Sequence, residues 1–168
     1  FLGKRVMTDD GKVHLAPVDF VAHARTLDAD FDRERATADQ LRLITRRERR
    51  THNSWTHNAE AFVGKGATNR VFVHPDDAAG AGLEEGERAV VRTATGKISL
   101  PVALDEDLMP GVIAVPHGWG HGRADGLAIA KAAAGENANV LSPDGPDACE
   151  PLSGMARLTA IPVELERA

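Results

Sequence analysis

Cysteine is almost absent from this sequence, which has one in 168 residues, Cys149. A disulfide needs two thiols, and structural zinc or iron–sulfur sites usually need several. Internal disulfides and multi-cysteine metal sites are therefore excluded within this chain. This usage favours a cytoplasmic location and leaves open the export of an already folded protein. Acidic residues flank Cys149 and disfavour its thiolate, so we expect an unreactive thiol.

Aromatic residues and long apolar runs are also scarce. Aromatics make up 4% of the sequence and tyrosine is absent, so aliphatic side chains must fill the core, for which an apolar fraction of 42% suffices. No apolar run reaches the roughly 18–20 residues of a membrane span, and the first residues lack a signal-peptide pattern. The sequence starts at Phe1 without a methionine. We therefore expect no membrane span and a chain that is part of a longer protein.

An excess of positive charge is missing as well. The formal net charge is −5, whereas nucleic-acid-binding domains usually carry a basic face over a basic total. We therefore expect no nucleic-acid partner. Positive charge is local instead, with five arginines between Arg42 and Arg50 and a single acid, Glu48, among them.

Residues 1–40 are predicted to be a lead-in to the main domain. The first part is expected to form a hairpin that turns at Asp9-Asp10-Gly11, because Asp-Gly pairs favour tight turns. A short helix is expected from Pro17, which suits a first helical turn. Residues 28–40 are charged and nearly free of large apolar side chains, so they are predicted to be a connector. The main domain is predicted over residues 41–168.

The main domain is predicted to be mainly β-structure with short helices. A hairpin is expected at Ala94-Thr95-Gly96-Lys97, and a short helix from Pro75. Residues 38–50 also have helical periodicity, so a helix remains an alternative for the first strand. Several short strands separated by turn signals indicate a β-barrel. The predicted strands lie within residues 41–45, 69–75, 86–93, 98–104, 112–115 and 156–166.

The arginine-rich stretch TRRERRTHNSWTHN, residues 45–58, is predicted to form a loop after the first strand. Guanidinium groups bind phosphate bidentately, and Asn, Ser and backbone N–H groups add donors. Trp55 offers a ring for stacking or for anchoring the loop. Composition by itself favours a solvated, charged loop, and phosphate binding gains support only if other polar loops lie beside it.

A second polar stretch, VPHGWGHG at residues 115–122, continues from the predicted buried strand at residues 112–115. Its glycines allow the backbone to approach a ligand closely, and His117 and Trp119 could contact that ligand. His117 and His121 would face one metal ion only on a helix, which three glycines disfavour. We therefore predict no metal site here.

A third polar stretch, ENANVLSPDGPD, spans residues 136–147. Asn137 and Asn139 offer a donor and an acceptor for the edge of a heterocycle. Asparagine equally shapes turns, and the turn interpretation is favoured on local sequence. The sequence contains no GxSxG, HExxH or Walker motif. It therefore predicts no catalytic residues, and binding rather than catalysis.

Taken in order, three segments resemble one known domain. They are LRLITRRERRTHNSWTHN, the block from RVFVHPDDAAGAGL through PGVIAVPHGWGHG, and NANVLSPDGPDACEPLSGMARLTAIPVEL. They resemble the C-terminal dinucleotide-binding domain of molybdopterin oxidoreductases, the superfamily of dimethyl sulfoxide reductase and formate dehydrogenase. The resemblance runs from Leu41 to Leu165. It implies a double-psi β-barrel that binds molybdopterin guanine dinucleotide.

The resemblance also implies which residues contact the cofactor. Many members have glycine where Arg46 stands, which is a departure in this chain, and Asn137 is an alternative to Asn139. The implied cofactor contacts are Thr45, Arg46, Arg47, His52, Asn53, Ser54, Trp55, Asn58, His117, Gly118, Trp119 and Asn139.

The resemblance further implies that the Mo or W ligand, any iron–sulfur clusters and the substrate pocket lie in other domains of a parent oxidoreductase. Those domains are the expected partners, and the isolated chain is expected not to turn over substrate. A stand-alone double-psi barrel used for protein interaction or recognition is the alternative function. Substrate, redox partner and oligomeric state are not readable from the sequence.

Overall fold

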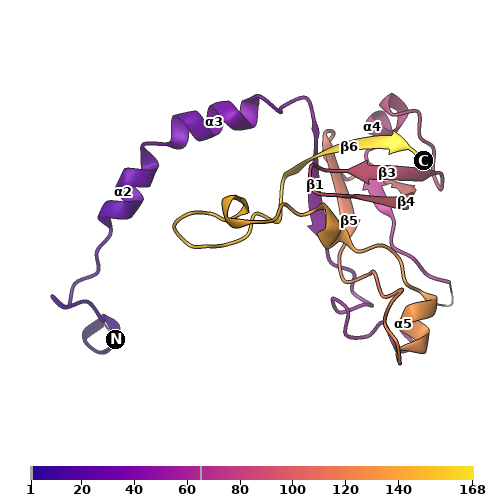
Figure 1. The fold of residues 1–168 in the computed structure, drawn as a ribbon, viewed down its shortest axis with the longest axis horizontal. Helices are drawn as coiled ribbons and strands as arrows, with labels where there is room; N and C mark the ends of the chain where they lie inside the picture. The colour runs from indigo at the N-terminus through magenta and orange to yellow at the C-terminus, as the bar shows by residue number, and fades with distance from the viewer. Residues whose placement is uncertain (1, 65) are drawn as a thin grey trace. The chain divides into compact units, whose positions relative to one another are not determined.

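The computed structural model describes residues 2–64 and 66–168, which form two units (Figure 1). One unit ends at Ala38 and the other starts at Asp39, close to the predicted boundary at residue 40. None of the helices in the described residues is both long and apolar enough to cross a membrane. The first unit contains α1 (Leu2–Arg5), α2 (Val18–Ala24) and α3 (Leu27–Arg35).

The predicted hairpin in the first unit is wrong, because no strands flank the turn in residues 2–16. The turn itself forms, with the Gly11 amide donating to the Thr8 carbonyl at 2.9 Å. Its other hydrogen bonds are also local: the Thr8 hydroxyl donates to the Lys12 carbonyl at 2.8 Å. A two-stranded hairpin without a third strand or a packed face is only marginally stable in water, and these local bonds do not supply such a face.

The short helix expected after Pro17 is confirmed as α2. The predicted connector is partly wrong, because its first half lies in α3. Acidic residues fill the first turn of α3 and arginines its last turn, which matches the helix dipole. Arg33 also donates to Asp30, three residues before it. Charge placement therefore supports α3, which was not predicted because the segment has few apolar residues.

The second unit is a closed barrel, which confirms the mainly β prediction. The strand order around the barrel is β1-β5-β2-β4-β3-β6. Its core consists mainly of valine, leucine, isoleucine and alanine side chains from the inner faces of the strands. The strands are β1 (Leu41–Arg46), β2 (Val71–Val73), β3 (Arg88–Arg92), β4 (Lys97–Leu104), β5 (Val112–Pro116) and β6 (Ile161–Arg167).

Local sequence signals account for several of these elements. β3 and β4 form the predicted antiparallel hairpin, in which the Thr93 amide donates to the Gly96 carbonyl at 2.8 Å. α4 (Pro75–Gly80) starts at the predicted proline, with the His74 side chain accepting from the Asp76 amide. The stretch that had helical periodicity is strand β1, because it pairs with strands on both sides. Pairing with strands distant in sequence therefore determines that this stretch is a strand and not a helix.

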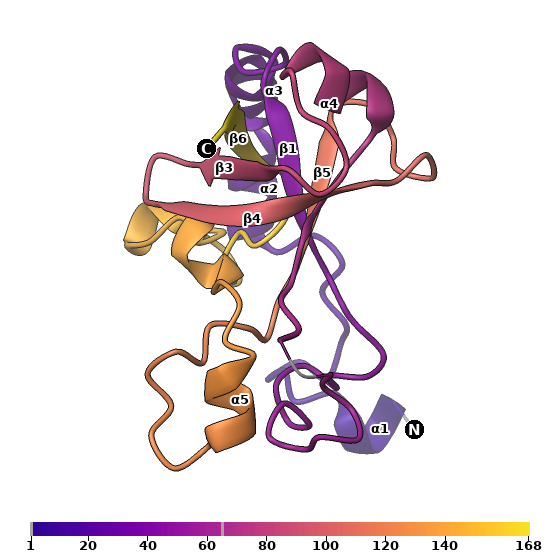
Figure 2. The same ribbon diagram turned by 90° about the vertical axis from the view of Figure 1, so that its right-hand side faces the viewer.

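Parallel pairing of β1 with β5 determines where the polar loops begin. Arg46 lies opposite Pro116, at the ends of the two strands. The His117 amide then donates to the Arg46 carbonyl at 3.2 Å and extends the ladder by one residue. The loops that follow β1 and β5 therefore leave the barrel from adjacent positions. Figures 1 and 2 both show the loop after β1 and helix α5 (Ala128–Ala132) at the same end of the barrel.

Candidate functional site

Three loops meet at this end of the barrel: the first loop (residues 47–58), the second loop (117–122) and the third loop (135–139). Gly118 has φ +87°, and a Cβ added there would lie 2.2 Å from the Asn53 carbonyl oxygen. A Cβ added to Gly120 would lie 2.5 Å from the Asn137 Cβ. Only glycine allows backbones to approach this closely. The second loop thus packs directly against both of the others.

A side-chain hydrogen bond joins the first and second loops. The Asn53 Oδ1 and His117 Nε2 atoms are 2.8 Å apart. Because an amide oxygen only accepts, Nε2 carries the proton in this pair. The neutral ring then has a bare Nδ1, a buried atom without a hydrogen-bond partner in residues 2–64 and 66–168. Asn53 has φ +60°, a conformation that asparagine tolerates better than most residues.

The tryptophans have different roles in this structure. Trp119 is 7% exposed, and its Nε1–H donates to Glu48 Oε2 at 2.9 Å, which ties the second loop to the first. Trp119 is therefore a packing residue here, and the resemblance implied a cofactor contact for it. Trp55 is 83% exposed, with the His52 ring against its edge at 5.9 Å between centroids. Trp55 is the aromatic face open to a ligand.

His57 lies fully inside this loop cluster. Its ring is 1% exposed and lies 4.6 Å from the Trp119 ring and 4.7 Å from the His121 ring, centroid to centroid. His121 in turn donates through Nε2 to the Gly118 carbonyl at 2.8 Å. Burial, with a smaller contribution from His121, lowers the pKa of His57 below its ordinary value. His57 is therefore neutral at physiological pH.

Three arginines at the end of β1 and in the first loop differ in their contacts. Arg46 pairs with Asp105 at 3.1 Å and lies over the Phe72 ring at 4.0 Å from its centroid. Its guanidinium is thus held along the barrel wall, and the cofactor contact implied for it stays a prediction. Arg47 is exposed, and its side chain has no ion pair or hydrogen bond among the residues that the structure describes. Arg50 donates to the Ala61 carbonyl at 3.1 Å.

Asn58 has a structural role in this arrangement. Its Oδ1 accepts from the amides of Ile129 at 3.2 Å and Ala130 at 3.4 Å. These amides lie at the start of α5, whose first N–H groups have no partner within the helix. Asn58 therefore links the first loop to α5. The resemblance implies a cofactor contact for Asn58, but its side-chain oxygen already accepts these two hydrogen bonds.

The third loop contains the turn that local sequence favoured. Asn137 Oδ1 accepts from the Asn139 amide at 3.0 Å and starts the short helix η1 (Ala138–Leu141). Both asparagines are exposed, but the Asn137 oxygen is already used in the turn, so Asn139 is the one whose amide oxygen stays available to a ligand. Thr45, at the end of β1, and Ser54, in the first loop, are exposed as well.

Sequence reasoning missed Asn69, which is fully buried just before β2. Its Nδ2 donates to the carbonyls of Pro116 at 3.2 Å and Glu136 at 3.0 Å, and its Oδ1 accepts from the Glu136 amide at 2.9 Å. Asn69 thus holds the end of β5 to the third loop. Its only sequence signal is an asparagine between a polar loop and a strand, which is too common to single it out. Glu48 and His57 were also missed.

The chemistry of the cluster is that of a binding surface. No group of three or more His, Cys, Asp or Glu side chains in the described part of the chain is arranged to hold a metal ion. The exposed groups are a guanidinium, amides, hydroxyls and an indole, which suit phosphate oxygens and heterocycle edges.

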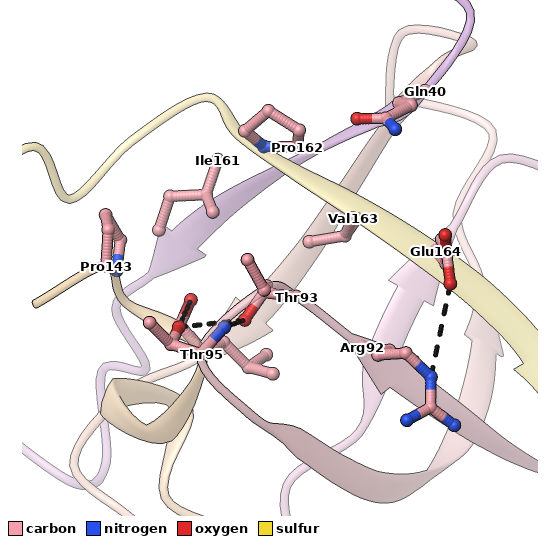
Figure 3. A pocket seen from close by; sticks show the side chains of 11 residues that line it. Gln40, Arg92, Thr93, Thr95, Pro143, Ile161, Pro162, Val163 and Glu164 are labelled. Atoms are coloured by element: carbon pink, nitrogen blue, oxygen red, sulfur yellow. Dashed lines mark hydrogen bonds and ion pairs between the residues drawn. The ribbon is translucent and has the colours of Figure 1, made fainter. Parts of the chain in front are cut away.

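A pocket of about 470 Å³ lies elsewhere, beside β6 and the β3–β4 hairpin (Figure 3). Ile161 and Pro143 supply apolar lining, and Arg92 at its side is paired with Glu164. None of the predicted cofactor residues lines this pocket. The surface formed by the three loops, called the cradle below, is thus separate from this pocket.

Comparison with known proteins identifies one family across the barrel. The family described as "Molydopterin dinucleotide binding domain" matches residues 41–162. A tetrathionate reductase subunit of Salmonella typhimurium (strain LT2) is 40% identical over 53 residues, which are 32% of this chain and 5% of that protein. Acetylene hydratase from Pelobacter acetylenicus has a similar structure, with a TM-score of 0.65 and 25% identity, over 82% of this chain and 19% of that chain.

These findings support the cofactor-binding role and not the alternative of a recognition module. Both relatives are named as enzymes, and the chain spans only a small part of either. The match covers strands β1 to β5, the start of β6 and all three loops, and it includes every predicted cofactor residue. The chain therefore belongs to the molydopterin dinucleotide binding domain family, and its barrel is a cofactor-binding domain.

Proposed function

We propose that the barrel binds molybdopterin guanine dinucleotide through its three polar loops, as one domain of a larger molybdenum or tungsten oxidoreductase. The remaining domains of that enzyme are the partners, and they supply the metal's protein ligand and the substrate pocket. We place the enzyme in the cytoplasm, which the near absence of cysteine supports.

The observation that carries this proposal is the junction of Gly118, Asn53 and His117. The second loop touches the first through a backbone contact that only glycine allows, and through the 2.8 Å bond between His117 and Asn53. Exposed polar groups far apart in sequence are thereby collected on one surface. Such a close contact between two loops is not expected if the first loop is only a solvated surface segment.

The residues present fit the cofactor's chemistry. A pyrophosphate is dianionic, and the Arg47 guanidinium is exposed beside the hydroxyl-bearing and amide-bearing part of the first loop. Trp55 offers an exposed ring for a heterocycle. Asn139 offers both a donor and an acceptor for a guanine or pterin edge. Arg46 fits less well, because Asp105 already pairs with it.

When bound, the molybdopterin cofactor supplies the metal-centred redox chemistry of the enzyme. This chain's own contribution is binding and orientation. Arg47 neutralises phosphate charge, Asn53 and Ser54 provide polar contacts, and the closely packed second loop fixes the first loop in place. The rigid strands beneath the loops keep these groups aimed at one ligand.

Arg47→Ala and Asn53→Ala in the parent enzyme are each expected to lower cofactor occupancy. A hydrogen bond to a charged group contributes about 1.5–3 kcal/mol, which corresponds to roughly a 10- to 100-fold weaker affinity. Molybdenum or tungsten content and released guanine nucleotide, measured per mole of enzyme, check this prediction. Arg88→Ala is the matched control, because Arg88 is also exposed but hydrogen-bonds Ser99 on the barrel wall. Unchanged cofactor content in both loop variants would refute the proposed cradle.

The 168-residue chain by itself is expected to show no substrate turnover, even with cofactor added. The reason is that the metal's protein ligand and the substrate pocket are assigned to the other domains of the enzyme. A dye-linked reductase assay with the purified chain, compared with the parent enzyme, measures this. Robust turnover by the chain alone would contradict the assignment of catalysis to other domains.

A further inference from the structure

His57 belongs to the first loop, yet both of its ring neighbours belong to the second. The Trp119 ring is tilted by 56° against it and the His121 ring is nearly perpendicular, at 89°. Each neighbour has a further bond within the cluster, Trp119 to Glu48 and His121 to the Gly118 carbonyl. The His57 ring therefore fills the space between the two loops that form the cradle.

The nitrogen atoms of His57 make this placement unusual. Both are buried, and neither has a hydrogen-bond partner within residues 2–64 and 66–168. Burying polar atoms without partners costs free energy, which a phenylalanine or leucine at this position would avoid. The ring therefore acts here through its contacts with the Trp119 and His121 rings, and its nitrogens make no hydrogen bond to the described residues.

We propose that His57 is a positioning residue that couples the first loop to the second and so holds the cradle in its binding geometry. This role rests on the proposed function, since the cradle is the cofactor site proposed above. His57 itself is buried against the rings of the second loop. Its effect on the cofactor passes through Gly118 and Asn53, which the coupled loops bring into contact.

Coupling by a neutral ring has a consequence at low pH. The charged and titratable groups of the two loops are His121, whose ring contacts His57, Glu48, which accepts from Trp119, and His117, which is bonded to Asn53. The first loop adds His52 and three arginines. The pKa of His57 is lowered in the folded chain, so the unfolded chain takes up the proton first. The stability that neutral His57 provides is therefore present above its ordinary pKa of about 6.5 and is lost as pH falls below that value. His121 keeps its donor to Gly118 in either protonation state.

Amide hydrogen exchange of the 168-residue chain tests the coupling. His57→Ala is expected to lower the protection of amides in both loops by about tenfold at pH 7.5, with the β3–β4 hairpin unchanged. Reporter amides are His57, bonded to the Ser54 carbonyl, and His121, bonded to the Ala134 carbonyl. His57→Phe retains a ring between the loops, so protection is expected to persist and to lose its dependence on pH between 7 and 5.

His52→Asn is the matched control: it removes an exposed histidine from the same loop and keeps a residue that tolerates φ +44°. It is expected to leave the second loop's protection unchanged. The proposal is overturned if His57→Ala leaves protection unchanged or lowers it in one loop only. It is also overturned if the protection of His57→Phe still depends on pH. Guanine-nucleotide content of the parent enzyme separates this result from the proposed function. If His57→Ala loses protection but the parent enzyme keeps its nucleotide content, the proposed coupling is supported. The assignment of the cradle as the cofactor site is then contradicted.

Discussion

Gly118→Ala is expected to destabilise the barrel by about 3 kcal/mol and to remove the bound cofactor from the parent enzyme. A left-handed backbone conformation in a non-glycine residue costs about 1–2 kcal/mol, and forcing an extra methyl group into packed atoms costs about 1–3 kcal/mol. At Gly118 both apply, because φ is +87° and the new Cβ would lie 2.2 Å from the Asn53 carbonyl oxygen. The first loop must move away, and His117 then loses Asn53.

Gly126→Ala separates the two contributions. Gly126 has φ +86°, nearly the same conformation, but a Cβ there would meet nothing within 4 Å. We expect it to cost only about 1 kcal/mol and to leave cofactor content unchanged. Urea unfolding of the chain and nucleotide release from the parent enzyme measure both effects. Equal losses in the two variants would show that the contact with Asn53 has no energetic role.

Asn69→Ala is expected to destabilise the barrel by about 3 kcal/mol. Each net hydrogen bond contributes about 1 kcal/mol, and each buried group left without a partner costs about 1–3 kcal/mol. The variant removes the bonds to the Pro116 carbonyl and to both backbone groups of Glu136, at a position that is fully buried. Chemical denaturation should show a lower midpoint with an unchanged slope.

Two companion variants make this prediction specific. Asn139→Ala removes an exposed asparagine, so its effect on stability should stay within about 0.5 kcal/mol. Asn69→Asp keeps the shape but places a carboxylate against two carbonyl oxygens. It should be worse than Asn69→Ala at pH 7 and partly recover as pH falls, because burial raises the pKa of the introduced carboxyl and the protonated form can donate. A small effect of Asn69→Ala would mean that water replaces the amide.

Local sequence was sufficient for elements with local causes. The β3–β4 hairpin follows from a four-residue turn between alternating segments, and α4 follows from Pro75 and the acids after it. It was insufficient in the first unit, where the Asp9-Asp10-Gly11 turn formed without strands. A turn specifies a chain reversal, but strands need partners that this segment does not have among residues 2–16.

Sequence reasoning located the three loops of the site but not the orientation of their side chains. Arg46 was expected among the phosphate contacts, and Asp105, fifty-nine residues away, holds it on the barrel wall. Trp119 was expected at the ligand, and Glu48 and His57 hold it inside. Each of these partners is distant in sequence or lies in another loop, so no local pattern contains the information.

The sequence by itself determined what this chain lacks, namely internal disulfides and multi-cysteine metal sites. Its composition and turn signals determined a mainly β domain with polar loops. Its resemblance to molybdopterin-binding domains indicated the ligand. Only the tertiary structure decided that the loops after β1 and β5 start side by side, because parallel pairing joins Arg46 to Pro116 across 70 residues of chain. The same long-range pairing brings Gly118 against Asn53 and encloses His57. Contacts of this kind depend on barrel closure, which no local segment specifies.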